Sequence, residues 1–279
     1  MRLPTGLVSL LDQGLISQVV RPLMSGKEAQ VYLVMSEGEE RVAKVYKEST
    51  QRTFKHRAVY TEGRKSRNSR DQRAMAKGSR HGRAKDEEAW RSAEVDMIYR
   101  LRAADVTVPT PYHFLDGVLV MELVKDEYGE PAPRLGEVEL DAPSAEVVFD
   151  QLIREVVKML CAGVAHADLS DFNVLMGADG PVVIDFPQSL DAAGNQSARK
   201  ILIRDVANLN GFLLGYGANP RPLHHAAEMW ALYASGDLLP DTPLTGRFKG
   251  SNADVDLGAL ITELEDDERD EMRRRGAST

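Results

Sequence analysis

The segment HADLSDFNVL, residues 166–175, places Asp168 five residues before Asn173. It lies on an expected loop between a long apolar helix and a short strand. An aspartate in such a loop can accept the proton of an attacking hydroxyl, and an asparagine five residues later can hold a magnesium ion. The pattern D-x-x-x-x-N also occurs by chance, so on its own it is weak support for phosphoryl transfer.

The segment that follows supplies a second oxygen ligand. NVLMGADGPVVIDF, residues 173–186, predicts a hairpin of two short strands around GADG. With the turn centred near Asp179, Asn173 lies opposite Asp185, and the Cβ atoms of such partners are roughly 5 Å apart. Because magnesium combines a few protein oxygens with phosphate oxygens, this register predicts that the two residues share a metal ion. A polar hairpin end exposed to water is the alternative.

Lys44 lies within an apolar strand, VAKVYK, where a buried ammonium needs an anionic partner. Val42 and Lys44 share one face of the strand, which would place an apolar wall beneath an adenine and a cation at its phosphates. Glu94, on a helix expected over residues 86–103, is the candidate ion-pair partner. An edge-strand lysine that reaches solvent is the alternative interpretation.

The segment SGKEAQVY, residues 25–32, occupies a strand–turn–strand position. It supplies the hydroxyl of Ser25, the flexible Gly26 and the cation of Lys27 over the place where phosphates would lie. It matches neither G-x-G-x-x-G nor the P-loop pattern, so it is not specific alone.

Two groups of elements must position these residues. Apolar runs of strand length come first and helical periodicity dominates later, with the Gly/Pro-rich linker DEYGEPAPRLG between them. This order indicates an α+β, bilobal pattern. We expect a first lobe over residues 1–124 and a second over 125–279. The expected strands are 31–35, 42–46 and 118–123, and the buried helix is 144–163.

A basic segment, residues 51–85, interrupts the first lobe as an insert at about residues 50–85. It carries twelve lysines and arginines against two acidic residues, a net charge of +10, in a chain whose net charge is −8. Such asymmetry favours contact with a polyanion such as RNA, or with an acidic surface. A solvated loop is the alternative.

Composition places the chain among globular proteins. Of its 279 residues, 43% are hydrophobic and 28% are charged. No run approaches eighteen apolar residues, so we expect no spanning helix and no membrane partner. The single cysteine, Cys161, has no partner for an internal disulfide, which favours a cytoplasmic location.

Taken together, these blocks resemble the RIO family of atypical serine/threonine protein kinases, and most closely the branch that lacks an N-terminal winged helix. The resemblance covers about residues 7 to 215. It implies a bilobal protein-kinase-like fold, with an antiparallel-sheet N-lobe containing one helix and a reduced, mainly helical C-lobe that diverges from about residue 216. The matching segments are SGKEAQVY, VAKVYK, RTFKHR, VTVPTPY, VMELV, HADLSDFNVL, VVIDFPQS and RDVANLNGFL.

The resemblance also implies where ATP would bind. Lys44 would contact the α- and β-phosphates and pair with Glu94. Met121 would be the gatekeeper, and the backbones of Glu122 and Val124 would bind adenine. The remaining ATP-binding residues would be Ser25, Gly26, Lys27 and Val31.

For the chemistry itself, the resemblance makes Asp168 the catalytic base and makes Asn173 and Asp185 the metal ligands. Asp185 is also a candidate phosphate acceptor, which would form an aspartyl-phosphate. One departure concerns Ala167, which takes the place of the usual glycine of H-G-D. The extra methyl group is tolerable unless the backbone needs a positive φ angle.

The function implied is an ATP- and magnesium-dependent serine/threonine protein kinase of RIO type, with manganese able to replace magnesium. It would act mainly by autophosphorylation or as an ATPase switch, and its partners would be ATP and a protein substrate that the sequence does not identify. Two alternatives stay open. One is a small-molecule phosphotransferase, which shares H-x-D-x-x-x-x-N, and the other is an RNA- or ribosome-binding factor that uses the basic segment.

Overall fold

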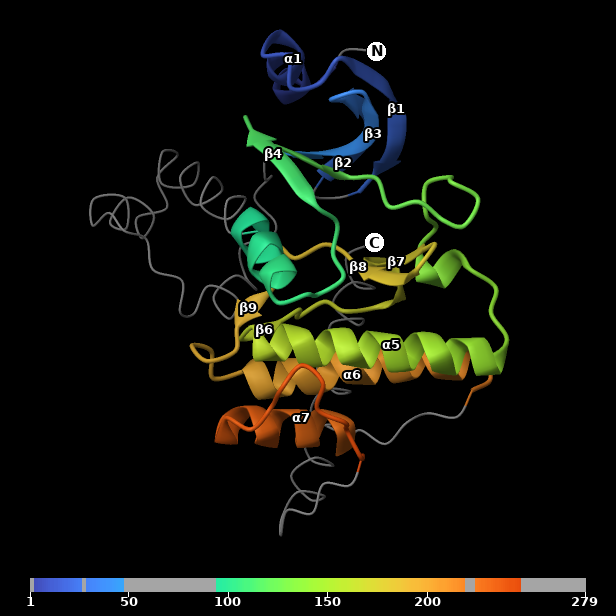
Figure 1. The fold of residues 1–279 in the computed structure, drawn as a ribbon, viewed down its shortest axis with the longest axis vertical. Helices are drawn as coiled ribbons and strands as arrows, with labels where there is room; N and C mark the ends of the chain where they lie inside the picture. Colours follow the sequence, from blue (N-terminus) through green and yellow to red (C-terminus); the bar gives the residue numbers. More distant parts are fainter. Residues whose placement is uncertain (1–2, 27–28, 48–93, 219–223, 247–279) are drawn as a thin grey trace, which may run out of the picture. The chain divides into compact units, whose positions relative to one another are not determined.

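The computed structural model describes residues 3–26, 29–47, 94–218 and 224–246 (Figure 1). Lys27, the basic segment and the residues from 247 onward lie outside this part of the chain. Two compact units are present, one over Met1–Val138 with Phe172–Ser189 and the other over Glu139–Asp171 with Leu190–Thr279. The first unit therefore extends beyond the boundary expected after residue 124, and it also takes in the hairpin near residue 180.

An antiparallel sheet with the order β1-β2-β3-β5-β4 forms the body of the first unit. The turn between β2 and β3 has two residues, Glu37 and Gly38, with φ angles of 53° and 83°. Two positive φ angles are what a tight hairpin of right-handed twist requires, and glycine supplies one without strain. The strands are β1 (Gln18–Ser25), β2 (Ala29–Ser36), β3 (Glu39–Tyr46), β4 (Pro111–Leu115) and β5 (Val118–Glu122).

The two faces of this sheet carry different apolar clusters. On one face, Ala43 and Val45 of β3 pack in a cluster with Leu7 and Leu10 of α1 (Thr5–Asp12). On the other face, Val42 packs with neighbouring strand residues and with Met121. Because side chains alternate along a strand, Lys44 and Tyr46 share the face of Val42. The alternation seen in VAKVYK thus sets the direction of Lys44.

A helix covers residues 94–103 of the described chain and buries Val95, Ile98 and Leu101 at helical spacing. The hairpin of β7 (Val174–Gly177) and β8 (Gly180–Val183) completes the first unit.

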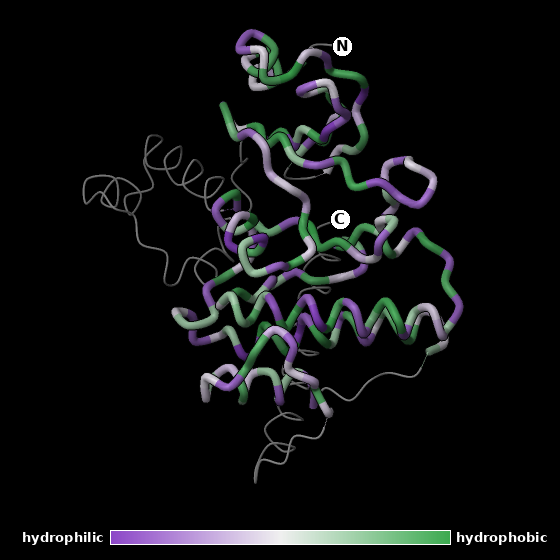
Figure 2. Tube along the Cα trace, in the orientation of Figure 1, coloured by the Kyte–Doolittle hydropathy of each residue, from purple (hydrophilic) through white to green (hydrophobic). Residues whose placement is uncertain are grey.

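Helices dominate the second unit. The longest, α5 (Ala142–Cys161), begins after Asp141, whose side chain accepts a hydrogen bond of 2.9 Å from the Ser144 N–H and so caps the helix. Hydrophobic and hydrophilic residues recur along α5 (Figure 2), as the sequence predicts for a helix with one buried face. The other elements are β6 (Val164–Ala165), β9 (Leu190–Asp191), α6 (Ala198–Gly215) and α7 (His224–Ser235).

The predicted α+β fold class is therefore confirmed. Among the described residues, the first unit has an antiparallel sheet with α1 and the helix over residues 94–103, one helix more than expected, and the second unit is mainly helical. None of the helices in the described ranges combines the length and the apolar character that crossing a bilayer needs. The expected cytoplasmic location stays a prediction.

Candidate active site

Lys44 is the centre of a buried ionic cluster in the first unit. Its Nζ lies 2.7 Å from Glu94 Oε1 and 2.6 Å from Asp185 Oδ1. Lys44 is 9% exposed and Glu94 is 2% exposed, whereas the Asp185 side chain is 40% exposed. The expected ion pair between Lys44 and Glu94 is present, and the alternative of an edge-strand lysine is excluded because β3 lies inside the sheet.

The two carboxylates keep this lysine charged. Burial alone would lower the pKa of Lys44, but the negative charges of Glu94 and Asp185 outweigh it and hold the pKa well above its ordinary value. The sheet thus holds the Lys44 ammonium in a fixed position between the buried Glu94 carboxylate and the Asp185 carboxylate, which is still accessible to solvent.

Tyr46 belongs to the same cluster, and the sequence analysis missed it. Its hydroxyl donates a hydrogen bond of 2.7 Å to Glu94 Oε2. Burial, together with the charge of Glu94, raises the pKa of Tyr46 well above its ordinary value, so the hydroxyl keeps its proton. The signal was present in VAKVYK, where Tyr46 follows Lys44 by two residues and therefore shares its face.

The hairpin register differs by one residue from the predicted one. Val174 pairs with Val183 and Gly177 with Gly180, so Asn173 lies opposite Ile184, whose N–H donates to the Asn173 carbonyl over 3.0 Å. The prediction that Asn173 faces Asp185 was therefore wrong. The reason is the turn, which has two residues instead of being centred on Asp179.

Beyond that pair the backbone leaves the strand. β8 ends at Val183, and Asp185 has a φ angle of 71°, so its side chain direction does not follow from strand alternation. Asn173 is 7% exposed at the end of a short 3₁₀ turn, η2 (Asp171–Asn173). The Asn173 amide and the Asp185 carboxylate thus both lie next to the hairpin, but they are not the directly opposed cross-strand pair that was predicted.

The expected phosphate segment is described on both sides of Lys27. β1 ends at Ser25, and the Gly26 N–H donates to the Ala29 carbonyl over 2.9 Å. The ammonium of Lys47 hydrogen-bonds the Ser25 hydroxyl and the Gly26 carbonyl, a contact that the sequence analysis did not anticipate. The neighbouring Val31 is paired opposite Lys44 in the β2–β3 ladder.

The three expected adenine residues follow one another along β5 and beyond it. Met121 packs in the apolar cluster of Val42, on the face that carries Lys44. The Glu122 N–H donates to the Thr110 carbonyl over 2.8 Å, and the Val124 carbonyl accepts from the Ala132 N–H over 2.9 Å. These two backbone groups are therefore already used inside the fold.

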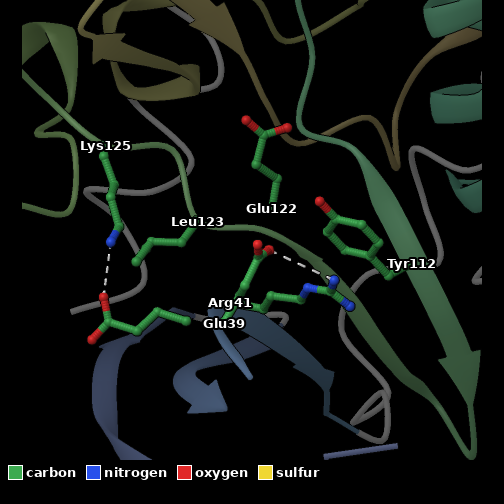
Figure 3. A pocket seen from close by; sticks show the side chains of 7 residues that line it. Glu39, Arg41, Tyr112, Glu122, Leu123 and Lys125 are labelled. Atoms are coloured by element: carbon green, nitrogen blue, oxygen red, sulfur yellow. Dashed lines mark hydrogen bonds and ion pairs between the residues drawn. The ribbon is translucent and has the colours of Figure 1, made fainter. Parts of the chain in front are cut away.

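A polar pocket opens at this end of the sheet, and Glu122 lines it (Figure 3). Arg41, also in its wall, lies over the Tyr112 ring at 3.5 Å from the ring centre and pairs with Glu37 at 2.7 Å. Lys44 and Asp185 do not line this pocket. The Glu122 side chain therefore belongs to a different region from the ionic cluster, and it also accepts from the Thr110 hydroxyl over 2.7 Å.

Asp168 lies in the second unit, exposed on a loop whose backbone α6 holds. Buried Asp205 accepts the N–H of Ala167 at 2.9 Å and that of Leu169 at 3.3 Å. The Asn208 side chain donates to the Leu169 carbonyl at 2.9 Å, and the Arg204 side chain donates to the Ala167 carbonyl. The backbone on both sides of Asp168 is thus fixed by one helix.

Ala167 has a φ angle of 71°, so the condition under which its methyl group is unfavourable is met. A non-glycine residue in the left-handed region costs roughly 1–2 kcal/mol. The hydrogen bonds from α6 hold the residue in this conformation.

Asp205 is the second residue that the sequence analysis missed. It is 1% exposed, and burial raises its pKa to about 7 against the lowering effect of the Ala167 N–H and of the Arg204 charge. A signal existed in RDVANLNGFL, because a carboxylate among apolar positions of a helix needs a partner. That partner lies 38 residues earlier and is not evident from the helix itself.

Comparison with known proteins identifies the family of this chain. The sequence profile of the RIO domain matches residues 30–224. This chain belongs to the RIO domain family. The resemblance found in its motifs is therefore confirmed over most of its length.

Three relatives of this RIO chain are named as serine/threonine kinases. "Serine/threonine-protein kinase RIO1" of Homo sapiens is 33% identical over 211 residues, which are 75% of this chain and 35% of that protein. "RIO-type serine/threonine-protein kinase Rio1" of Haloferax volcanii is 32% identical over 75% of this chain and 68% of that protein. "Serine/threonine-protein kinase rio1" of Schizosaccharomyces pombe is 29% identical over 74% of this chain and 40% of that protein. The chain thus spans well under half of the human and yeast relatives.

Within this RIO chain, the expected site residues divide between the two units. The first unit brings Lys44, Glu94 and Asp185 into direct contact. It also contains Ser25, Gly26, Val31, Met121, Glu122, Val124 and Asn173, whereas Asp168 belongs to the second.

Proposed function

We propose that this RIO chain is an ATP- and magnesium-dependent serine/threonine protein kinase. The observation that carries the proposal is the buried Lys44, held between Glu94 and Asp185 at 2.7 and 2.6 Å. A lysine whose side chain is already held in place can contact the phosphates of a nucleotide without a further entropy cost for ordering that side chain. The names of the relatives support protein as the substrate class.

Adenine would be held by backbone groups beyond the gatekeeper Met121. Because the Glu122 N–H and the Val124 carbonyl are used within the fold, the Glu122 carbonyl and the Val124 N–H are the groups that we assign to adenine. Ser25, Gly26 and Val31 would line the phosphates and the sugar. Lys27 is proposed to join them and lies outside the described residues.

Asn173 and Asp185 fit a divalent cation by their chemistry. An amide oxygen and a carboxylate are hard oxygen donors, and magnesium commonly takes one or two protein ligands and completes its shell with phosphate oxygens and water. When bound, the ion would neutralise part of the phosphate charge. Asp185 would hold the ion instead of Lys44, and Lys44, still paired with Glu94, would contact the phosphates.

Asp168 is proposed as the catalytic base. The attacking serine or threonine hydroxyl would lose its proton to the Asp168 carboxylate as its oxygen forms the new bond to the γ-phosphorus. The bond from that phosphorus to the β–γ bridging oxygen breaks, and ADP leaves with the electron pair. The clamp from Asp205 and Asn208 would fix the backbone that carries this carboxylate.

Acceptors in the same molecule are favoured because covalent attachment raises their effective concentration at the site. The basic segment contains Ser66 and Ser69 and follows the strand of Lys44, so we propose autophosphorylation there. Transfer to Asp185, or hydrolysis of ATP as a switch, is the other outcome proposed. The charge of the segment supports a second role in binding RNA or a ribosomal particle.

Incubation with ATP and magnesium, followed by mass spectrometry, tests the assignment. We expect slow phosphorylation of Ser66 or Ser69, which Asp168→Asn should abolish, or a labile phosphate on Asp185, whose carboxylate needs no base and which Asp168→Asn need not abolish. Turnover that is equal in Asp168→Asn would contradict the role of the base. Rapid phosphorylation of small alcohols instead would favour the small-molecule phosphotransferase.

A further inference from the structure

Tyr46 is a buried titratable side chain to which the proposed phosphoryl transfer assigns no role. It is the last residue of β3 and is 6% exposed. Its hydroxyl donates to Glu94 Oε2 over 2.7 Å, and its ring centre lies 5.3 Å from Lys44 Nζ. Tyr46 therefore contacts both members of the ion pair.

Glu94 depends on two donors. At 2% exposure its oxygens are out of reach of bulk water, and a buried carboxylate without hydrogen bonds is costly. Lys44 satisfies Oε1 and Tyr46 satisfies Oε2. A carboxylate held at both oxygens cannot swing about its last bond, so the hydroxyl of Tyr46 determines where Oε1 meets Lys44.

Lys44 has a second, competing anion. Asp185 Oδ1 lies 2.6 Å from the same ammonium, and its side chain is 40% exposed. The proposed reaction would replace this carboxylate contact by nucleotide phosphates. Glu94 must then hold Lys44 in place while the other partner changes, and it can do so only if it is itself fixed.

Glu94 begins the described part of the helix over residues 94–103 and lies 48 positions after Tyr46 in the sequence. Side-chain contacts join this helix to β3. The hydrogen bond from Tyr46 to Glu94 is one of the contacts that do so.

We propose that Tyr46 is a positioning residue, whose hydroxyl fixes Glu94 so that Glu94 holds Lys44 at the nucleotide phosphates. The inference rests on the proposed ATP chemistry and gives Tyr46 no contact with the nucleotide.

Tyr46→Phe tests the role, because it removes the hydroxyl and keeps the ring beside Lys44. We expect kcat for ATP turnover, per folded molecule, to fall by about ten- to hundredfold, as for the loss of a hydrogen bond to a charged group. KM for ATP should change by less than about threefold, since the bond acts through Lys44 in the transition state.

The matched control is Tyr32→Phe. Tyr32 is a buried tyrosine of β2, 4% exposed, on the opposite face of the sheet, and its hydroxyl bonds Gln30 Oε1 at 3.1 Å. This variant removes the same atom from the same sheet without touching Glu94. We expect its kcat to stay within about twofold of the unmodified protein.

Repeating Tyr46→Phe in a Glu94→Gln variant distinguishes a positioning role of Tyr46 from a general effect on the stability of the protein. Because Tyr46 acts through Glu94, Tyr46→Phe should lower kcat by less than about twofold once Glu94→Gln is present. Equal losses in both backgrounds, or a loss no larger than that of Tyr32→Phe, would overturn the positioning role. Absence of ATP turnover in the unmodified protein would overturn the proposed function and the inference with it, whereas ATP turnover that Tyr46→Phe leaves unchanged would overturn the inference alone.

Discussion

Asp205 should make the stability of the protein depend on pH in a way that one substitution removes. Its pKa rises from the ordinary value of 3.8 to about 7 in the fold, chiefly because the carboxyl is buried. The folded protein then binds the proton more tightly than the unfolded chain. Below about pH 4 both states are protonated, and stability falls as pH rises from there to about 7, above which the contribution is constant.

The size of the effect follows from the same shift. About three pKa units at about 1.4 kcal/mol each correspond to roughly 4 kcal/mol of unfolding free energy across this range. Asp205 is 1% exposed, so solvent does not screen the effect appreciably. Between about pH 5 and 6.5 the slope from this group alone is close to −1.4 kcal/mol per pH unit.

Asp205→Asn removes the titrating group and keeps its shape. Urea unfolding of both proteins, followed by circular dichroism at several pH values, gives the difference in stability at each pH. We expect the unmodified protein to lose stability relative to Asp205→Asn as pH rises from 5 to 7, with no further change at pH 8. A difference that does not vary with pH, or one of opposite sign, would refute the reasoning.

Three further predictions concern other parts of the chain. Ala167→Gly should increase the free energy of unfolding by up to about 1 kcal/mol, and so raise the melting temperature, because glycine adopts a φ of 71° without strain. A lower melting temperature in a thermal scan would contradict this. Asp185→Asn should raise the magnesium concentration needed for half-maximal turnover and lower kcat, since the charged ligand supplies most of the attraction; an unchanged magnesium titration would exclude Asp185 as a ligand. Replacing Arg64, Lys65, Arg67 and Arg70 with alanine should weaken RNA binding and flatten its dependence on salt without changing ATP affinity; equal salt dependence in a filter-binding assay would leave the segment without this role.

The features that could be predicted from the sequence are those that depend on short-range patterns, such as the alternation of side chains along a strand. The alternation in VAKVYK predicts the direction of Lys44. The partner Glu94 could be proposed because a buried ammonium requires an anion. These inferences need only the period of a strand and the energetics of a buried charge.

What the sequence could not predict depends on turn geometry and on distant contacts. The hairpin register slipped by one residue because the choice between a two-residue turn and a turn centred on Asp179 is not evident from GADG. The bond from Asp205 to the Ala167 N–H joins residues 38 apart, and no periodic pattern reports such a contact. The strained backbone at Ala167 is visible only once its φ angle is known.

ATP turnover of Lys44→Ala tests the central claim most directly, namely that the lysine held by Glu94 and Asp185 serves the nucleotide phosphates. The control is Lys158→Ala, which removes a lysine that pairs with Glu155 at 2.7 Å in α5. Turnover per folded molecule should fall by about two orders of magnitude or more in Lys44→Ala and stay near that of the unmodified protein in Lys158→Ala. Equal turnover in folded Lys44→Ala and in the unmodified protein would contradict the account.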